Sequence, residues 1–480
     1  MTNRYLQGPF APLQDEYTLT DLEVAGTIPD YLDGRYLRNG PNPIGEIDPE
    51  HSHWFIGDGM VHGIRIRDGK AEWYRNRWVR GPNAAKELGE PPPAGHVGLY
   101  GLGSNTNVIG HAGRTFALVE GGEPQYELTD DLDTVGVCDF DGTLTGGYTA
   151  HPKRDPETGE LHAVSYSAFR GNKVQYSVIG VDGRVRRTVD ITVAGSPMMH
   201  DFSLTERYVV LYDLPVTFDA PIAAAMTVPR GLRLSARLML SALIGRVPIP
   251  DPITARIHVP KASERRFPYS WNPKYPARVG VMPREGGDAD VRWFDVEPCY
   301  VFHPMNAFDE GNTIVLDVVR YPKVFERDHT GPNDGPPALD RWTVDLADGK
   351  IRESRFDDRA QEFPRVDERL VGKRHRYGYA PTALAGIEGD DTLLKHDFVR
   401  GSTESRSFGP GKALGEFVFH HSSPGAAEDD GVLMGFVYDR PTDRSELAIV
   451  DAHTLHDIAS IKLPHRVPAG FHGNWVPSSN

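Results

Sequence analysis

Hydrophobic and polar positions along the chain form many short apolar runs rather than a few long ones. Each run is rich in β-branched and aromatic residues and is bounded by Gly, Pro, Asp or Asn, a pattern typical of strands that end in turns. Clear examples span residues 115–121, 208–214, 313–321, 432–439 and 446–452. Because such runs recur from one end of the chain to the other, the pattern predicts an all-β fold.

Turn signals between the runs indicate how the strands are connected. Asp-Gly pairs at 68–69, 141–142, 182–183 and 348–349 are typical of tight hairpins between antiparallel strands. A chain of 480 residues with so many short strands favours a β-propeller over a sandwich. No repeat such as a WD signature marks the blades, so their number does not follow from the pattern itself.

Residues 219–250 interrupt the strand pattern with alternating leucines and arginines. No acidic residue occurs from Ala220 to Pro250, although the chain as a whole has a formal charge of −15. The segment predicts an amphipathic or nearly amphipathic helix with a basic face, which is suited to an anionic membrane surface. A helix packed on the β core, with its arginines in solvent, is the alternative interpretation.

The composition narrows the class of protein. The 52 Lys and Arg residues are outnumbered by 67 Asp and Glu residues, and the absence of a strong basic stripe argues against a nucleic-acid partner. The N-terminus lacks a signal-peptide pattern and no run of 18 apolar residues occurs, so we expect a cytoplasmic protein. Two cysteines, Cys138 and Cys299, exclude a disulfide framework but leave a single bridge open.

Four of the nineteen histidines stand in short runs marked by aromatic residues or proline. They are His151 in YTAHP, His200 in MMHDF, His303 in VFHPM and His472 in GFHGNW. Neutral imidazole is the commonest protein ligand for iron, copper and zinc, and a set of histidines without a carboxylate indicates a redox metal rather than magnesium or calcium. The four lie far apart in the chain, so only the tertiary fold can bring them together.

These runs resemble those of the carotenoid cleavage oxygenases. That family includes apocarotenoid oxygenases, plant and animal carotenoid dioxygenases and bacterial stilbene-cleaving enzymes. The resemblance extends from LDGRYLRNGPNP at 32–43 and HWFIGDGMVHG at 53–63, through the histidine runs, to EFPRVD at 362–367 and the final FHGNWVP. The order and spacing of these motifs are more specific than any one of them, and the actinobacterial members are the most similar.

The resemblance implies a fold and a metal centre. It implies one domain over residues 1–480, a seven-bladed β-propeller with a dome of loops and helices over the metal face. It also implies a ferrous ion on the propeller axis, held without heme or flavin by His151, His200, His303 and His472. Three glutamates that orient these histidines in the family fall on Glu120, Glu362 and Glu416.

The resemblance also assigns roles to residues that carry no signal of their own. Thr106 would stand against a vacant iron position and leave one open site for dioxygen. His62 matches a family signature without being a ligand. His420 and His421 are adjacent, so in a strand their side chains are expected to point to opposite faces.

The implied reaction is oxidative cleavage of a carbon–carbon double bond in a carotenoid or apocarotenoid, which yields two carbonyl products. The partners would be an apolar polyene, dioxygen and, through a tunnel mouth at 219–250, a membrane surface. Cleavage of a stilbene or phenylpropenoid is the alternative. Stilbene-cleaving members carry a Lys immediately before the first of the three glutamates, where this chain has Val119, which favours the carotenoid.

Two further interpretations are open. Retinoid isomerisation is a chemistry that the resemblance also admits. A propeller can serve as a binding scaffold without catalysis. A scaffold would be expected to lack some of the four histidines, whereas all four are present here.

Overall fold

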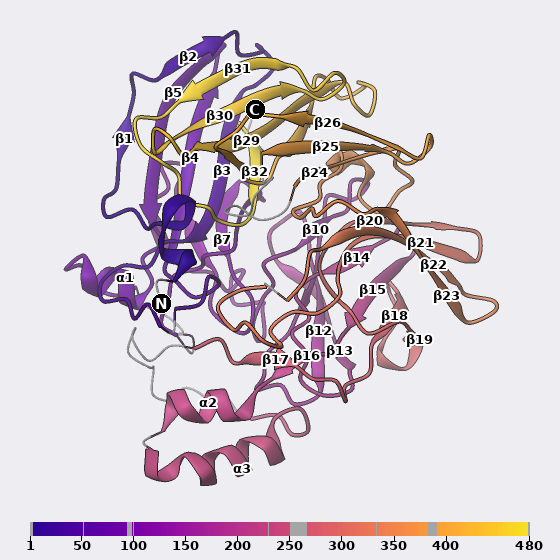
Figure 1. Cartoon of the computed structure of the whole chain (residues 1–480). Helices are drawn as coiled ribbons and strands as arrows, with labels where there is room; N and C mark the ends of the chain where they lie inside the picture. Colours follow the sequence, from indigo (N-terminus) through magenta and orange to yellow (C-terminus); the bar gives the residue numbers. More distant parts are fainter. Residues whose placement is uncertain are drawn as a thin grey trace.

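The computed structural model is a ring of β-sheets around a central axis (Figure 1). It describes residues 3–50, 52–93, 98, 100–228, 230–249, 266–332, 334–382 and 391–478. Within these residues, seven antiparallel sheets of three to six strands form the blades of a β-propeller. The predicted all-β class and the seven-bladed architecture are therefore confirmed.

Five blades are built from strands that follow one another in the chain. The first of these blades consists of β6 (Asn107–His111), β7 (Arg114–Leu118), β8 (Tyr126–Leu128) and β9 (Thr134–Val137). The second consists of β10 (Lys153–Arg154), β11 (Leu161–Ser165), β12 (Lys173–Ile179) and β13 (Val185–Thr192). The third is β14 (Phe202–Leu204), β15 (Tyr208–Asp213), β18 (Arg278–Pro283) and β19 (Arg292–Asp295). The last two are β20 (Tyr300–Glu310), β21 (Thr313–Tyr321), β22 (Ala338–Asp345) and β23 (Lys350–Asp357), then β24 (Tyr377–Pro381), β25 (Thr392–Asp397) and β26 (Ser402–Ser407).

The remaining two blades combine strands from both ends of the chain. One has the order β1 (Thr18–Leu19), β5 (Lys70–Trp78), β4 (Gly59–Arg67), β3 (Gly34–Pro41) and β32 (Gly473–Pro477). The other has the order β2 (Glu23–Gly26), β31 (Asp457–Lys462), β30 (Arg444–Asp451), β29 (Gly431–Asp439) and β27 (Lys412–Leu414), with β28 (Val418–His421) also paired to β29. The pairings of β3 with β32 and of β2 with β31 close the ring.

The apolar runs of the sequence are strands that other blades cover on both faces. In β21 nearly every residue is buried, whereas the outermost strand of the same blade, β23, is largely exposed along its length. The main hydrophobic cluster lies between blades and includes Trp342, Tyr300 and Tyr321, each at most 1% exposed. The five quoted runs correspond to β7, β15, β21, β29 and β30, so these predictions are confirmed.

The Asp-Gly turns have the backbone that their residues favour. Arg67 pairs with Lys70 across a two-residue loop in which Asp68 and Gly69 have φ of 49° and 67°. Two successive positive φ angles define the type I′ hairpin, whose twist matches that of the flanking strands. The sequence therefore sets both the position and the tightness of this turn.

Helices lie outside the blades, where they and the long loops cover one end of the ring (Figure 1). They are α1 (Pro82–Glu87), α2 (Ala220–Thr227) and α3 (Arg233–Leu243), with short 3₁₀ turns at Arg4–Leu6, Gly8–Phe10, Arg230–Leu232, Asp288–Asp290 and Glu368–Leu370. β16 (Val216–Phe218) precedes α2 in the chain, β17 (Tyr269–Trp271) follows α3, and the two strands form a small two-stranded sheet. The single helix predicted over 219–250 is thus two helices, and residues 229 and 250 lie outside the described residues.

Two further expectations concern the cysteines and membrane crossing. Cys138 and Cys299 are both buried and free, so they form no bridge with each other. None of the helices that the structure describes is both long and apolar enough to cross a membrane.

Candidate metal centre

Four edge strands bring the four histidines to one point inside the ring. His151 lies two residues before β10, His200 two residues before β14, His303 within β20 and His472 immediately before β32. Each of these strands is the edge of a different blade. All four imidazoles are buried, and one ring nitrogen from each lies within 4.8 Å of the others. The distant positions in sequence therefore converge because each blade contributes one edge to the axis.

A local irregularity directs His303 inward. The pairing between β20 and β21 shifts register between Val301 and Pro304, on either side of this histidine. Proline has no N–H to donate to the neighbouring strand, and a bulge at such a point changes the direction of a side chain. The sequence His303-Pro304 thus places the imidazole off the regular alternation of the strand.

Three glutamates hold three of the imidazoles. Nδ1 of His200 lies 2.7 Å from Glu120 Oε1, Nδ1 of His303 lies 2.6 Å from Glu362 Oε2, and Nδ1 of His472 lies 3.0 Å from Glu416 Oε1. An ionised carboxylate can only accept, so Nδ1 carries the proton and Nε2 presents a lone pair. The structure thus brings the glutamates predicted from the sequence into contact with the histidines predicted from the sequence.

The unprotonated nitrogens face one another at the centre. Nε2 of His151 is 2.9 Å from Nε2 of His472, and Nε2 of His200 is 3.1 Å from Nε2 of His303. Two nitrogens bound at about 2.1 Å to one ion and at a right angle to each other would be about 3 Å apart. Lone pairs at such distances repel unless a proton or a cation lies between them. The donor set therefore fits a metal that prefers nitrogen ligands.

His151 differs from the other three. Its Nδ1 atom is buried and has no hydrogen-bond partner among the described residues. The backbone N–H of His151 donates to Thr149 Oγ1 at 3.1 Å. The orientation of this imidazole therefore depends on its backbone and on packing rather than on a carboxylate.

Electrostatics keep two of the imidazoles, those of His151 and His303, neutral. Burial, reinforced by the neighbouring imidazoles, lowers the pKa of His151 and of His303 well below the usual value. Burial raises the pKa of Glu362 to about 8, and a cation held by the histidines would favour the ionised form of this carboxyl. Burial acts in the same direction on Glu416, but Arg365 and His472 outweigh it and lower the pKa of that carboxyl. Neutral imidazoles can bind a metal without first losing a proton.

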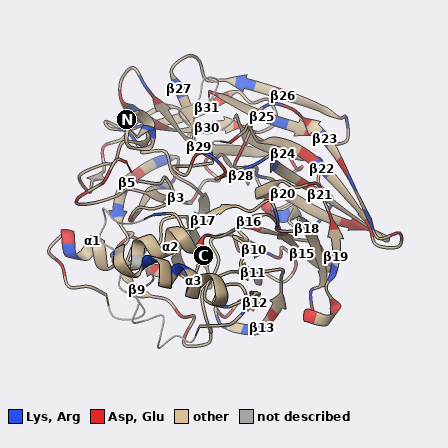
Figure 2. Ribbon diagram, turned by 60° about the horizontal axis from the view of Figure 1, so that its bottom comes forward, with Lys and Arg blue, Asp and Glu red and all other residues tan. Residues whose placement is uncertain are grey.

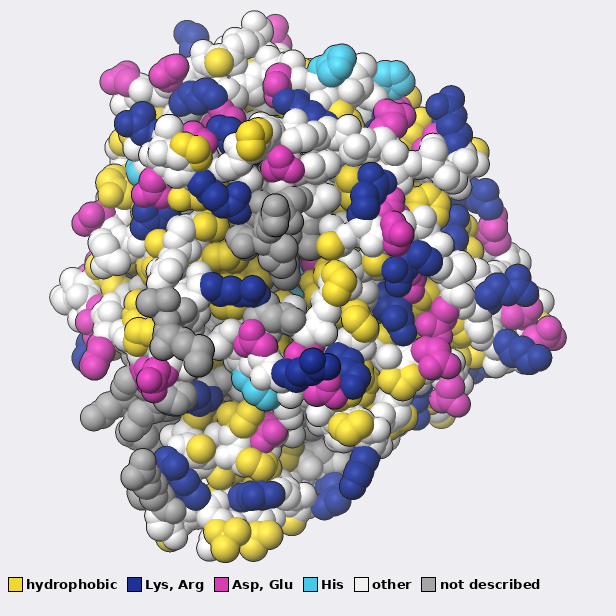
Figure 3. Space-filling model, in the orientation of Figure 1, with side chains coloured by type: hydrophobic (Ala, Val, Ile, Leu, Met, Phe, Trp, Pro, Cys, Tyr) yellow, Lys and Arg dark blue, Asp and Glu magenta, His cyan; other side chains and the backbone are white. Residues whose placement is uncertain are grey.

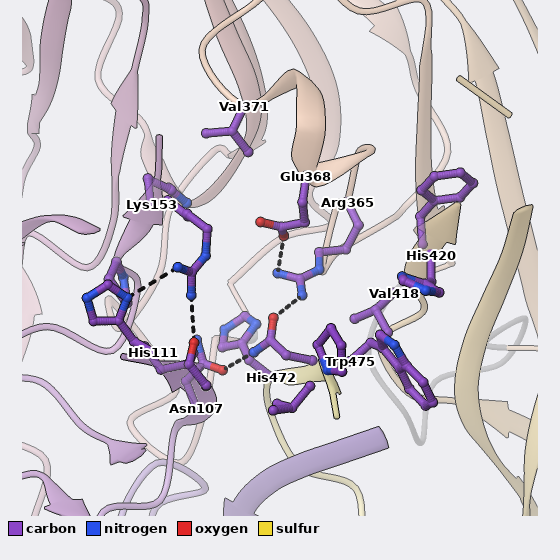
Figure 4. Close-up of a pocket in the computed structure, with 18 of the residues that line it drawn as sticks. Asn107, His111, Lys153, Arg365, Glu368, Val371, Val418, His420, His472 and Trp475 are labelled. Carbon is purple, nitrogen blue, oxygen red and sulfur yellow. Dashed lines mark hydrogen bonds and ion pairs between the residues drawn. The ribbon is translucent and has the colours of Figure 1, made fainter. Parts of the chain in front are cut away.

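Two cavities reach the histidines. One, of about 120 Å³, is mostly apolar and is lined by aromatic residues together with His200, His303 and His472. The other, of about 910 Å³, has many charged residues as well as apolar ones in its lining and is called the polar cavity; His151, His303 and His472 also line it (Figure 4). His303 and His472 therefore face both cavities.

Phe363 forms part of the wall between the cavities. It lines both of them, and its ring lies 5.5 Å from that of His303 and 5.4 Å from that of His472. Its φ of 51° is in the left-handed region, which costs a bulky residue on the order of 1–3 kcal/mol and is tolerated where the surroundings fix it. The Glu362 carboxylate accepts a hydrogen bond from the Phe363 N–H, which ties this backbone to the site.

Thr106 lies beside the histidines, on the side of the apolar cavity. Its carbonyl accepts a hydrogen bond from the His472 N–H at 3.0 Å, and its hydroxyl donates to Asn105 Oδ1 at 2.9 Å. Because the hydroxyl is already bonded, Thr106 contributes bulk rather than a free polar group. This placement is compatible with the steric role expected for it.

The other histidines that the structure describes lie outside the cluster. His62 is buried, with Nδ1 2.9 Å from the Tyr74 hydroxyl. His420 and His421 both line the polar cavity, and their rings are 4.8 Å apart, so the expectation of opposite faces is wrong at this end of β28. Figure 4 shows His420 beside Trp475, away from His472.

Sequence reasoning missed the charged residues of the polar cavity. Arg365 lies 3.7 Å from Glu368 Oε1 and 3.7 Å from Glu416 Oε1, and Figure 4 shows its ion pair with Glu368. Lys153 and Asp201 line the same cavity. Lys153 and Asp201 stand two residues and one residue after His151 and His200, so a signal was present in the same two motifs. Their contact depends on the tertiary fold and could not be read from the motifs.

Known proteins share this sequence and this architecture. The family described as retinal pigment epithelial membrane protein, RPE65, matches residues 10–477. A carotenoid cleavage oxygenase from Mycobacterium tuberculosis is 58% identical, over 99% of this chain and 98% of that protein. Carotenoid 9,10(9′,10′)-cleavage dioxygenase 1 of Arabidopsis thaliana is 33% identical, over 98% of this chain and 89% of that protein.

The fold has a similar counterpart among solved structures. The crystal structure of Pseudomonas brassicacearum lignostilbene dioxygenase superposes with a TM-score of 0.81, at 25% identity and with 100% of both chains covered. With matches over nearly its whole length, the chain belongs to the RPE65 and carotenoid cleavage oxygenase family, and it is an enzyme of the dioxygenase type.

Proposed function

We propose that the protein is a non-heme Fe(II) dioxygenase that cleaves a carbon–carbon double bond of a carotenoid or apocarotenoid into two carbonyl products. The observation that carries the proposal is a buried set of four histidines that opens on an apolar cavity. A ferrous ion held by His151, His200, His303 and His472 would supply the dioxygen chemistry. Imidazole suits iron, and the three glutamates supply negative charge to offset that of the metal.

The apolar cavity supports a polyene substrate. Its walls include Phe55, Phe267 and Phe302, which offer apolar surface beside the histidines. No Lys or Arg is among the described residues that line it, and Val119 occupies the position before Glu120. A phenolate would therefore find carboxylates but no Lys or Arg side chain among the described residues that line this cavity, whereas an uncharged polyene needs none.

The lining of this cavity includes residues next to α2. Phe169, Phe218 and Pro268 belong to it, and the Asp219 N–H at the start of α2 donates to the Pro268 carbonyl. A volume of about 120 Å³ holds only the part of a long polyene around the cleaved bond. In this proposal the rest of the substrate extends toward α2, where the tunnel mouth would lie.

Incubating iron-loaded protein in air with an apocarotenal and, separately, with a hydroxystilbene tests the substrate class. We expect two carbonyl products from the apocarotenal, identified by mass spectrometry, and little from the hydroxystilbene. Cleavage of the hydroxystilbene alone would contradict the proposal and favour the alternative. A geometric isomer without aldehydes would indicate isomerisation, and no product from either compound would indicate a binding scaffold.

Cleavage of a stilbene or phenylpropenoid is the second candidate function. The likeness to lignostilbene dioxygenase over the whole chain favours it. Val119 weighs against it, because that residue cannot pair with a phenolate. Replacing Val119 by lysine in the same assay shows whether a cation at this point raises stilbene cleavage relative to apocarotenal cleavage.

The helical segment offers a surface for a membrane. Leu234, Leu238 and Met239 of α3 are 68%, 63% and 58% exposed, and Arg233 and Arg237 are exposed beside them. Figure 2 shows blue bands, which mark basic residues, in the helical region of α2 and α3, and Figure 3 shows hydrophobic and basic side chains together at the lower end of the molecule. We infer that residues 1–480 act as one domain whose insertion, 219–250, contacts an anionic membrane around the tunnel mouth.

Replacing Leu234 and Leu238 together by glutamate is expected to reduce binding to anionic liposomes at least about tenfold. Each leucine buried in the interface contributes roughly 1.5–3 kcal/mol, and the new carboxylates repel the anionic headgroups. Co-sedimentation with phosphatidylserine-containing vesicles measures the effect. The matched control is Val399→Glu, at a residue 69% exposed between β25 and β26. Equal loss in both proteins, or no loss in either, would contradict this membrane contact.

A further inference from the structure

An ion pair in the wall of the polar cavity lies close to the histidines. Lys153 Nζ is 2.8 Å from Asp201 Oδ2, and the two side chains are 22% and 2% exposed. Both residues line the cavity together with His151 and His303. Figure 4 shows Lys153 on this wall.

The pair connects two blades at the axis. Lys153 is the first residue of β10 and stands two residues after His151. Asp201 follows His200 directly and precedes β14. Since β10 and β14 belong to different sheets, the contact links the two segments that carry these histidines.

His151 is the imidazole most in need of such a link. His200, His303 and His472 each have a carboxylate on Nδ1, whereas Nδ1 of His151 has no partner among the described residues. Its position relative to His200 must then come from the backbone that leads into β10. The ion pair fixes that backbone two residues away.

The pair is buried enough to act as a rigid connection. Asp201 Oδ1 also accepts a hydrogen bond from the Phe202 N–H at 2.7 Å, which orients the carboxylate against its own strand. Removing one partner of a buried pair leaves the other charge uncompensated, so the segments on both sides must rearrange. Such a rearrangement would reach both histidines.

We propose that Lys153 and Asp201 form a clamp that sets the spacing between His151 and His200 and thereby the affinity of the site for its metal. This role rests on the proposed metal centre and goes beyond it, because neither residue is a ligand or a partner of a ligand imidazole. Both are positioning residues. The clamp joins two blades at the one point where a histidine lacks a carboxylate.

A second ion pair provides a matched control. Arg284 Nη1 lies 2.6 Å from Asp155 Oδ2, with side chains 15% and 7% exposed. Asp155 follows β10 and Arg284 follows β18, so this pair joins the same two blades. Neither residue lines a cavity that reaches the histidines. Removing this pair therefore shows the effect of losing a buried ion pair between the same two blades while the clamp stays intact.

Titrating chelator-treated protein with Co(II), followed by its visible absorption, measures the affinity. We expect Lys153→Met and Asp201→Asn each to weaken Co(II) binding about 10–100-fold, as loss of a group that supports metal ligands does elsewhere. The double variant should lose little more than either single one, because the two act as a unit. Asp155→Asn should lower the melting temperature and leave Co(II) affinity within about threefold of wild type.

Charge-preserving variants cover the case in which the neutral variants do not fold. Lys153→Arg and Asp201→Glu keep the pair but change its length, so the Co(II) absorption bands should shift while the melting temperature of the metal-free protein stays the same. The clamp would be overturned if Co(II) affinity and the absorption bands were unchanged in every clamp variant. It would also be overturned if Asp155→Asn lost as much Co(II) affinity as the clamp variants do. Wild-type protein that takes up no Co(II) would reject the metal centre itself, and the clamp with it.

Discussion

Replacing His303 by alanine is expected to remove both the metal and the cleavage activity. The substitution deletes one of the four histidines proposed as ligands and leaves the Glu362 carboxylate buried without its imidazole partner. Loss of a direct ligand should weaken binding by more than the 10–100-fold that is typical of supporting residues. Purified His303→Ala should therefore contain well below one iron per chain by elemental analysis and give no detectable carbonyl product.

The matched control for this substitution is His62→Ala. His62 is equally buried and hydrogen bonded, to the Tyr74 hydroxyl, but it stands outside the cluster. Its loss should lower stability and leave the iron content near that of wild type. Stoichiometric iron in His303→Ala would contradict the assignment of the four histidines.

Replacing Glu362 by glutamine is expected to weaken metal binding about 10–100-fold. The Glu362 carboxylate accepts hydrogen bonds from His303 Nδ1 and from the Phe363 N–H. A glutamine of the same shape keeps one acceptor oxygen but removes the negative charge that makes the imidazole a stronger donor to the metal. It can also present its NH₂ group to Nδ1, which would disturb the tautomer. Competition with a chelator of known affinity measures the change.

Glu368→Gln is the control for the loss of a carboxylate. Glu368 also lines the polar cavity, but its side chain is 55% exposed and it forms an ion pair with Arg365 rather than with a histidine. Metal affinity in this variant should stay within a factor of about three of wild type. If Glu362→Gln binds the metal as tightly as Glu368→Gln does, the carboxylate does not support the ligand.

Local sequence signals predicted the strands and turns because these depend on neighbours in the chain. The run at 313–321 is apolar throughout since blades cover β21 on both faces, and the Asp68-Gly69 turn follows from residues that adopt positive φ. The number of blades came from family resemblance, because the strands share a shape and not a repeated motif. The break between α2 and α3 was missed although Pro229 and Gly231, both helix breakers, lie between the two helices in the sequence.

The candidate site was predictable to the extent that its residues lie in recognisable motifs. Resemblance selected four histidines and three glutamates, and the structure places them together. The pairing of particular glutamates with particular histidines required the fold. The same is true of the contact between Lys153 and Asp201, which joins positions 48 residues apart. Spacing alone cannot show which buried charges from different blades meet.

The closure of the ring has a consequence for the order of events during synthesis. His472 immediately precedes β32, the strand that pairs with β3. A nascent chain that has not passed residue 472 therefore lacks both one member of the histidine cluster and the strand that completes the blade of β3, β4 and β5. The last histidine and this strand become available together, so a complete cluster is expected only in chains whose two ends can pair.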